Sequence, residues 1–598
     1  MCGIVAILRQ PGRRSPPSAA EVLAGLDAAC AAVDELSTLG AAAEGLESAA
    51  RLLTGVAGAR ALLDDAALVA ATLERTTVVD RAVAEIEAAL DAGRARPEPY
   101  ELEELNATLV RVKDAAWAVR HDRVGRARAI AGLAGPGAGP AAVAAYASVQ
   151  TALSALDRLE VRGRDSAGIH LLVDGHGLDL DAPDVVAQLG PRVADAHFAS
   201  MAVRCPGGRL TFVYKAAAEV GELGDNVRQL RAAVAGDALL RRALSAGSAR
   251  AVVLGHTRWA SVGIISQANT HPVNHEEVGG TPSAPYVVAA VNGDVDNHAQ
   301  LVASAAMHIA VDVTTDSKVI PILVSRAMAG GLAAEEAFLD SVTRLEGSVA
   351  VAASMADAPD RLVLALRGSG QALNIGLAED AFVVASEAYG LVEDTARYLR
   401  MDGEGTRDGG QPGQMVVLDA AHAGELAGIG RRGYDGRPLP VDAAEVQTAE
   451  ITTRDIDRGG RSHYLLKEIG EAPSSFRKTL RGKLVEADGL LGVTLGDDAL
   501  PPAVRRRLAD GSIRRVVAVG QGTAAVAARS LAAIFAVVAP ASEMVVEPML
   551  ATELSGFGLA DDMADTLVVA VSQSGTTTDT NRTVDLARSR GASVIAIV

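Results

Sequence analysis

The first eight residues constrain the fold of this chain more than any other segment. Met1-Cys2-Gly3 leads directly into the apolar run Ile4–Leu8, which predicts a strand that fixes the N-terminus in a sheet. We expect Met1 to be removed, because the small side chain of Cys2 permits it. Cys2 would then carry a thiol and a free α-amine with an intrinsic pKa of roughly 7.7 to 8.0, so one residue supplies a nucleophile and its base. The alternative is that Cys2 merely follows the start codon.

Length and composition favour a soluble protein of several domains. The chain has 598 residues, 49% of them hydrophobic, and this length suggests three or four domains. The sequence lacks an apolar run of the ~18–20 residues that a membrane span needs and the pattern of a secretory leader, so we expect a cytoplasmic protein. A net charge of −18 argues against nucleic acid as a partner. The three cysteines, Cys2, Cys30 and Cys205, are too few for a disulfide framework or a metal cluster.

Residues 16–134 form an alanine-rich block with helical periodicity. Leucine and valine recur every three or four positions, as at Val83 and Ile86, which predicts five or six amphipathic helices. Glycines and prolines in residues 135–140 interrupt the pattern before a further predicted helix, residues 141–159. The block looks like an insertion and contains no metal-ligand spacing. We therefore expect a packing or oligomerisation appendage.

Two later segments carry polar side chains at the ends of predicted strands. The apolar run Ala251–Leu254 leads to Arg258, which can hold a carboxylate by two charge-assisted hydrogen bonds. The predicted strand Tyr286–Val291 ends in Asn292 and Gly293. Asn-Gly is the commonest hairpin dipeptide, so a tight turn is the alternative to an amide and an N–H group that face an oxyanion.

Asp316 and a glycine-punctuated turn also have ordinary structural explanations. Asp316 precedes a predicted helix, Lys318–Met328, and can act as an N-cap or can bind the α-ammonium group of a substrate. Residues 162–168 precede a predicted strand, Ile169–Val173, and turn formation alone would account for their glycines.

Six motifs occur in the order that is found in class II glutamine amidotransferase domains, and together they resemble that family. The motifs are Cys2–Val5, Arg162–Gly168, His256–Ala260, His271-Pro272, Val291–Gly293 and Thr315-Asp316. The resemblance implies an N-terminal-nucleophile fold of four layers, αββα, with two antiparallel sheets between helical layers. It also implies that Cys2 attacks the side-chain amide of glutamine.

The same resemblance assigns roles to individual residues. Asn292 and Gly293 would hold the oxyanion, Arg258 would bind the glutamine carboxylate, and Asp316 would bind its α-amine. Further glutamine-binding residues are implied at Arg162, Trp259 and Ser261. The sequence departs from the family's usual residues at Val161, Arg164 and Val262.

The last part of the chain alternates strands and helices in the manner of a doubly wound α/β domain. We expect strands at residues 515–519, 544–547, 566–571 and 592–598, with helices at 523–536 and 578–590. Two strand-to-helix junctions, Gly520–Thr523 and Ser572–Thr577, carry small hydroxyl residues. Unpaired N–H groups at a helix N-terminus, together with such hydroxyls, can cradle a phosphate. Ordinary helix capping is the alternative.

These junctions resemble the sugar isomerase (SIS) family, whose Ser-Gln-Ser-Gly segment binds the phosphate of a sugar phosphate. The implied sugar-phosphate contacts are Gln521, Gly522, Thr523, Ser572, Gln573, Ser574 and Thr577. Gln521 stands where a cysteine is usual, and Ala524 where a serine is frequent. The predicted sheet stops at Val598, so we expect a C-terminally truncated SIS domain.

The two resemblances divide the chain and define an expected activity. The expected parts are an amidotransferase domain of residues 2–9 and 141–425, a helical insertion of 10–140, a linker with a connecting helix at 426–475, and the SIS domain at 476–598. This combination resembles glutamine-dependent fructose-6-phosphate amidotransferases. It implies hydrolysis of glutamine at Cys2 and transfer of the ammonia to fructose 6-phosphate, giving glucosamine 6-phosphate, without a metal or organic cofactor. It also implies a homodimer.

We expect this chain to perform the glutaminase step at most, because the family's second SIS domain is missing. One alternative is another class II amidotransferase, such as a purine-pathway phosphoribosyl transferase. The other is a non-catalytic sugar-phosphate-binding protein that has kept both folds.

Overall fold

The computed structural model describes the chain except for residues 1, 93, 95–98, 218–220, 282, 369, 405–411, 482, 488, 498, 541, 574 and 576. The chain divides into two compact units. The first unit contains residues 1–95 and 105–472, and the second contains residues 96–104 and 473–598. None of the helices in the described part of the chain is both long and apolar enough to cross a membrane.

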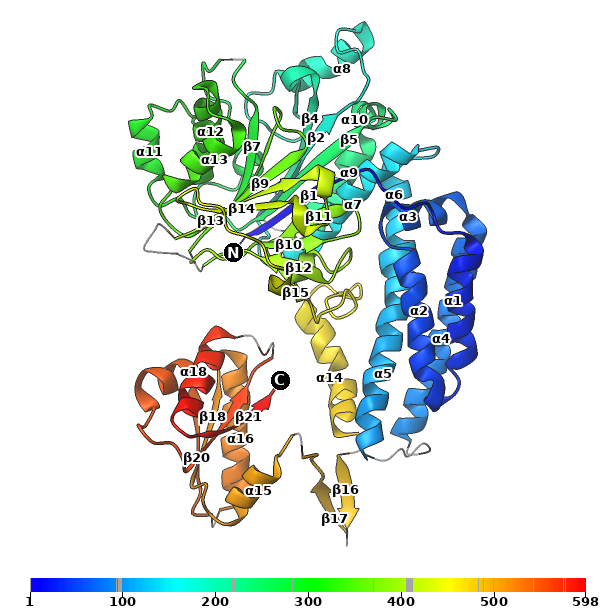
Figure 1. Ribbon diagram of the computed structural model, residues 1–598, viewed down its shortest axis with the longest axis vertical. Helices are drawn as coiled ribbons and strands as arrows, with labels where there is room; N and C mark the ends of the chain where they lie inside the picture. Colours follow the sequence, from blue (N-terminus) through cyan, green and yellow to red (C-terminus); the bar gives the residue numbers. More distant parts are fainter. Residues whose placement is uncertain are drawn as a thin grey trace. The chain divides into compact units, whose positions relative to one another are not determined.

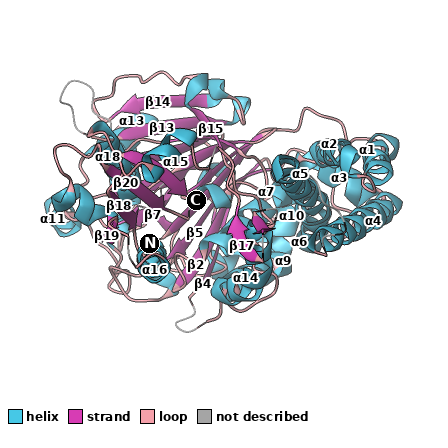
Figure 2. Cartoon of the chain, turned by 90° about the horizontal axis from the view of Figure 1, so that it is seen from below, coloured by secondary structure: helices cyan, strands magenta, loops and turns pink. Residues whose placement is uncertain are grey.

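Two antiparallel sheets form the centre of the first unit (Figure 2). The nine-stranded sheet has the order β15 (Val446–Thr448), β12 (Arg397–Arg400), β10 (Asn374–Leu377), β11 (Ala381–Ala385), β1 (Gly3–Arg9), β5 (Arg250–Arg258), β2 (Ser166–Asp174), β4 (Leu210–Ala216), β3 (Val203–Arg204). The six-stranded sheet has the order β14 (Ile429–Gly433), β13 (Gln414–Asp419), β9 (Arg361–Arg367), β8 (Val349–Met355), β7 (Val287–Gly293), β6 (Val273–Asn274). Strand β1 therefore lies inside its sheet, as the apolar start of the chain predicts.

Strand β1 is buried on both faces, and its alternate residues enter two different cores. Ile4 and Leu8 pack between the two sheets, against residues of β7 and β8. Val5 and Ile7 point to the opposite face and pack against α7 (Pro140–Leu159). Because successive side chains of a strand point to opposite faces, one strand can join two cores.

Helices cover the outer face of each sheet. The nine-stranded sheet is covered by α7, α8 (Pro183–Val193), α9 (Asp225–Gly236) and α10 (Ala238–Leu244). The six-stranded sheet is covered by α11 (His298–Ser304), α12 (Val319–Ala329) and α13 (Ala334–Thr343). The layers are therefore helix, sheet, sheet, helix, and the αββα fold expected from the sequence is confirmed.

The alanine-rich block forms a helical bundle, drawn in blue in Figure 1. Its helices are α1 (Ala19–Ala32), α2 (Leu39–Leu52), α3 (Gly55–Asp64), α4 (Ala66–Asp91), α5 (Pro99–Trp117) and α6 (Arg126–Ala134). A π-helical segment, Ala118–Gly125, joins α5 to α6. Helix α1 begins with a capping box, in which the side chains of Ser18 and Glu21 satisfy the first free N–H groups. The six helices agree with the sequence periodicity.

Strands β14 and β15 lie inside the stretch 426–475, which we expected to be a linker. β14 pairs with β13, and β15 pairs with β12, so each is an edge strand of one of the two sheets. The connecting helix is α14 (Tyr464–Leu480).

The second unit contains a four-stranded parallel sheet. Its order is β19 (Val545–Leu550), β18 (Arg515–Gly520), β20 (Thr566–Val571), β21 (Ser593–Ile597). One face packs against α15 (Pro502–Ala509) and α16 (Thr523–Val538), and the other against the π-helical segment Leu554–Gly558 and α18 (Thr578–Ser589). A separate hairpin is formed by β16 (Leu484–Ala487) and β17 (Leu490–Val493). The doubly wound arrangement expected for the end of the chain is confirmed.

Candidate active site

The thiol of Cys2 lies at the N-terminal end of β1, beside the end of β5. Its Sγ accepts a hydrogen bond from the backbone N–H of Trp259 at 3.2 Å, and the Trp259 carbonyl oxygen lies 3.5 Å from the same sulfur. Burial raises the pKa of the Cys2 thiol, while the Trp259 N–H and the nearby Arg258 act in the opposite direction. The thiol is therefore mostly protonated near neutral pH, and an attack by sulfur requires a base.

Asn292 contacts the same residue from the other sheet. Its amide nitrogen Nδ2 donates to the carbonyl oxygen of Cys2 at 3.1 Å and to Ser386 Oγ at 2.8 Å. Its oxygen Oδ1 lies 3.1 Å from Nε2 of His256. Burial lowers the pKa of His256 to about 3, so this imidazole is neutral. The Asn292 side chain is thus fixed at both ends.

Asn292 and Gly293 do not form a two-residue hairpin turn. They are the last residues of β7 and pair with Ala350 and Val349 of β8. Gly293 has a φ of +86°, and a Cβ atom there would lie 2.0 Å from the carbonyl oxygen of Ser348. Only glycine fits this position, because both the backbone conformation and the space exclude a side chain.

Arg258 is buried and bound to the loop that follows it. Its guanidinium donates to the carbonyl oxygens of Val262, of Gly263 at 3.4 Å and of Ile264 at 3.0 Å. Burial lowers the pKa of Arg258, and the proximity of Cys2 and of Asp316 opposes this. Arg258, the predicted binder of the glutamine carboxylate, therefore lies near the thiol. Its guanidinium N–H groups are hydrogen-bonded to backbone carbonyl oxygens.

The predicted ammonium-binding residue, Asp316, is not an N-cap. It lies within a short helical turn, Asp316–Lys318, whose N-cap is Thr315. Its Oδ2 accepts the backbone N–H of Val295 at 2.6 Å, and its Oδ1 accepts the Ser317 hydroxyl at 3.2 Å. The carboxylate thus holds the loop after β7.

The three remaining predicted glutamine-binding side chains have different surroundings. Ser261 donates to Asp294 Oδ1 at 2.6 Å. Trp259 is 55% exposed as a residue, although its backbone N–H contacts the thiol. Arg162 forms an ion pair with Glu387. Ser386 and His256 complete the contacts around Asn292, and the sequence motifs predict a role for neither.

The predicted phosphate-binding loops lie at the switch point of the parallel sheet. The chain moves from β18 to its neighbour β19 and then returns to β20 on the other side of β18. The junctions after β18 and β20, Gly520–Thr523 and Ser572–Thr577, therefore meet at the carboxyl ends of adjacent strands. Ligands of open α/β sheets bind at such a point.

Several side chains of these loops form hydrogen bonds with each other or with neighbouring residues. Gln521 Nε2 donates to Thr552 Oγ1 at 3.3 Å, and the hydroxyls of Ser572 and Thr577 lie 3.4 Å apart. Ser572 Oγ also accepts the backbone N–H of Gly575 at 3.1 Å. Gly522, Thr523 and Gln573 are exposed, and Ser574 lies outside the described residues.

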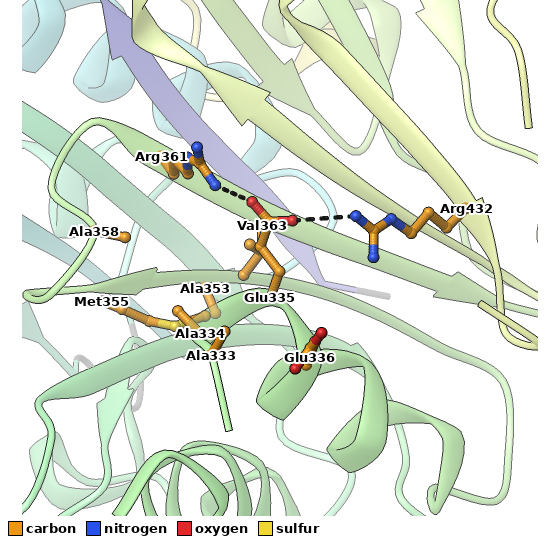
Figure 3. A pocket seen from close by; sticks show the side chains of 10 residues that line it. All are labelled: Ala333, Ala334, Glu335, Glu336, Ala353, Met355, Ala358, Arg361, Val363 and Arg432. Carbon is orange, nitrogen blue, oxygen red and sulfur yellow. Dashed lines mark hydrogen bonds and ion pairs between the residues drawn. The ribbon is translucent and has the colours of Figure 1, made fainter. Parts of the chain in front are cut away.

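A pocket elsewhere in the described structure and the arrangement of the potential metal-ligating side chains do not point to a second site. A pocket of about 240 Å³ lies on the outer face of the six-stranded sheet, and the Glu335 carboxylate there faces Arg361 and Arg432 (Figure 3). It contains none of the predicted site residues. Within the described residues, no group of three or more His, Cys, Asp or Glu side chains is arranged to hold a metal ion.

Comparison with known proteins relates the chain to one family model and to several proteins. Residues 512–598 match the SIS domain family. A protein of Symbiobacterium thermophilum named glutamine–fructose-6-phosphate aminotransferase (isomerizing) is 33% identical over 361 residues, which are 58% of this chain and 50% of the relative. This chain is similar to the isomerizing glutamine–fructose-6-phosphate aminotransferases. An aminotransferase of the same name from Streptomyces coelicolor is 30% identical over 76% of this chain and 60% of the relative.

The chain thus spans between half and three fifths of the length of these two aminotransferases. Two solved structures share 17% identity and cover 75% of this chain and 78% of the other chain. They are an allosteric regulatory enzyme of purine biosynthesis, with a TM-score of 0.34, and a glutamine phosphoribosylpyrophosphate amidotransferase from B. subtilis, with a TM-score of 0.33.

Proposed function

We propose that this chain hydrolyses glutamine with Cys2 as the nucleophile. The observation that carries the proposal is the hydrogen bond of 3.2 Å between the Trp259 N–H and the Cys2 sulfur, next to Arg258. Asn292, bound to the Cys2 carbonyl oxygen, lies beside the same residue. The proposed nucleophile, a proposed oxyanion donor and a cation for the substrate carboxylate are therefore neighbours.

In the proposed reaction, the α-amine of Cys2, freed by removal of Met1, accepts the thiol proton while sulfur attacks the amide carbon of glutamine. Asn292 donates both amide hydrogens, to the Cys2 carbonyl oxygen and to Ser386, in the free protein, so it would turn one of them to the oxyanion, and the Gly293 N–H would be the second donor. The C–N bond then breaks, ammonia leaves with the transferred proton, and a thioester remains. Water cleaves the thioester, releases glutamate and restores the thiol. The base is needed because burial raises the pKa of the Cys2 thiol.

Glutamine binding would use Arg258 for the carboxylate and Asp316 for the α-ammonium group. Arg258 must exchange the carbonyl oxygens of residues 262–264 for the charged carboxylate, which is the stronger acceptor. The loop that carries these carbonyls would then move as the substrate binds. Trp259, Ser261 and Arg162 would border the bound glutamine.

We further propose that the ammonia aminates fructose 6-phosphate to give glucosamine 6-phosphate in the full-length protein. The match to the SIS family and the names of the similar aminotransferases support this acceptor. Gln521, Gly522, Thr523, Ser572, Gln573, Ser574 and Thr577 would bind the sugar phosphate. We also propose that the reaction takes place in the cytoplasm and that the active protein is a homodimer.

The nucleophile is tested by labelling with a glutamine analogue that carries an electrophile, followed by peptide mass spectrometry. We expect one label, on Cys2 at the N-terminus of protein that has lost Met1, and no label after Cys2→Ala. The matched control Cys205→Ala should be labelled like the wild type. A label on another residue, or active protein that retains Met1, would refute the assignment.

Glutamate release with and without fructose 6-phosphate separates the proposed function from its alternatives. We expect release in both conditions and loss of release in Cys2→Ala. Binding of fructose 6-phosphate without any glutamate release would instead indicate a sugar-phosphate sensor. Amination of a phosphoribosyl acceptor would indicate a different amidotransferase.

A further inference from the structure

Lys215 of β4 is a buried lysine whose side-chain nitrogen lacks a hydrogen-bonding partner in the described part of the chain. The residue is only 4% exposed, and its Nζ finds no acceptor there. Its one ring contact is with Phe198, whose centroid lies 5.0 Å from Nζ. By contrast, the buried Lys318 donates to Asn274 O at 2.7 Å and to Asn274 Oδ1 at 2.9 Å. A buried polar group without a hydrogen-bonding partner is costly, so Lys215 requires an explanation.

Lys215 faces a small cleft at the edge of the two-sheet core. The cleft has a volume of about 20 Å³ and is lined by Lys215, Lys318, Asn274, Glu276, Phe198 and His197, among others. A single water-sized species needs at least about 10–15 Å³, so the cleft can hold one such species. A phosphate ester or an amino acid would not fit.

No carboxylate of the described residues forms a hydrogen bond with Lys215, although charged groups lie near it. Lys318 and Arg204 repel a proton on Lys215, and Asp195 attracts it. Glu276 is neutralised by Arg204, which reaches both carboxylate oxygens at 2.5 and 2.8 Å. Burial and Lys318 hold the pKa of Lys215 well below its ordinary value. His170 and His271, which also face Lys215, are held neutral by burial, and His197 at the cleft pairs with Asp312.

The segment that covers Lys215 is held in a strained conformation. Phe198 and Met201 have φ angles of 51° and 71°, and among the described residues only one other non-glycine residue, Ala306, has a positive φ. Such conformations are unfavourable for residues with a side chain and persist where the surroundings enforce them. In this conformation the Phe198 ring lies over Lys215 and Arg204, at 5.0 and 5.5 Å.

We propose that Lys215 binds one halide-sized anion in this cleft. The anion would accept a hydrogen bond from Nζ and stabilise the protonated form of the amine, with Lys318 on the same cleft adding attraction. Because Lys318 belongs to the turn that carries Asp316, the bound anion would link β4 to that turn. The site is independent of the glutaminase proposal, because it uses neither Cys2 nor the SIS domain.

Anomalous diffraction from crystals of the whole chain grown in bromide tests the site directly. We expect a bromide peak within hydrogen-bonding distance of Lys215 Nζ. In solution, the melting temperature should rise with bromide concentration relative to the same ionic strength of gluconate, which is too large for the cleft. Lys215→Met should lose the peak and the bromide-specific rise. Lys467→Met, which removes one positive charge elsewhere, should keep both.

Two results would overturn the proposal. One is ordered water at Lys215 without anomalous signal in bromide crystals of the wild type, an experiment that does not depend on the folding of a variant. The other is an equal bromide-specific rise in melting temperature for the wild type and Lys215→Met.

Discussion

Asp122 in the π-helical segment provides a sharp test of the electrostatics of the helical insertion. Its carboxylate is 8% exposed, and the hydroxyl of Thr453 lies 2.8 and 2.7 Å from its two oxygens. The same hydroxyl accepts the indole N–H of Trp117 at 3.1 Å. Burial first, and the nearby Glu393 second, raise the pKa of Asp122 from 3.8 to about 6. Arg123, the Thr453 hydroxyl and Arg158 oppose the increase.

The direction of the pH effect follows from this raised pKa. The folded protein binds the Asp122 proton more tightly than the unfolded chain does, so ionisation of Asp122 lowers the free energy of unfolding. The loss of unfolding free energy that ionised Asp122 causes is complete above about pH 6. This loss disappears as the pH falls below 3.8. The pKa difference corresponds to at most about 3 kcal/mol at pH 8, and to about half of that at pH 5.

We therefore expect Asp122→Asn to increase the free energy of unfolding by about 1–3 kcal/mol at pH 8, because asparagine keeps the shape and removes the charge. The gain should be about half as large at pH 5. Urea unfolding followed by tryptophan fluorescence measures this. The chain has two tryptophans, so Trp259→Phe leaves Trp117 as the only reporter.

The matched control is Asp34→Asn, which removes an exposed carboxylate of the same insertion and should change neither curve. A loss of stability in Asp122→Asn at pH 8, or an equal gain at both pH values, would refute the reasoning. The first result would mean that the charged form is the better partner of Thr453. The second would mean that the effect is not electrostatic.

Three further substitutions test the candidate sites. Ser386→Ala removes the acceptor of the Ile4 N–H and of Asn292 Nδ2, both at 2.8 Å, so glutaminase turnover should fall at least tenfold while circular dichroism stays unchanged. Gly163→Ala would bring a Cβ within 2.8 Å of the Arg258 backbone, and the unfolding free energy should fall by about 1–3 kcal/mol in urea titrations. Thr577→Val should weaken fructose 6-phosphate binding several-fold in calorimetry, and the adjacent exposed Thr578→Val should not.

Sequence patterns predicted the regular elements well where the pattern is local. The helix predicted at residues 141–159 is α7, and the strand predicted at 566–571 is β20 with the same bounds. The edge strands β14 and β15 were missed, because they lie in a stretch rich in glycine and proline and form only through pairing with distant strands. Local propensity contains no information about such partners.

The same distinction applies to the candidate site. Cys2 is recognisable from its place in the sequence, and Arg258 from its place at a strand end. Ser386 contacts Ile4 across 382 positions of the chain, and nothing in its neighbourhood distinguishes it from other serines after a strand. The hairpin alternative for Asn292 failed for a related reason, because β7 pairs with β8, which begins more than fifty residues later.

The contacts of the helical insertion argue that it is an integral part of the first unit. Residues of α3 and α6 belong to the same hydrophobic core as β1 and α7, so removal of the insertion would expose the side chains of α7 that pack against α3 and α6. Arg126 also pairs with Asp394 at 2.5 Å, and both side chains are 4% exposed. Loss of one member of a buried ion pair costs about 3–5 kcal/mol. A deletion of residues 10–140 would leave Asp394 without this partner, and it would thereby destabilise the support of β1 and of the proposed nucleophile.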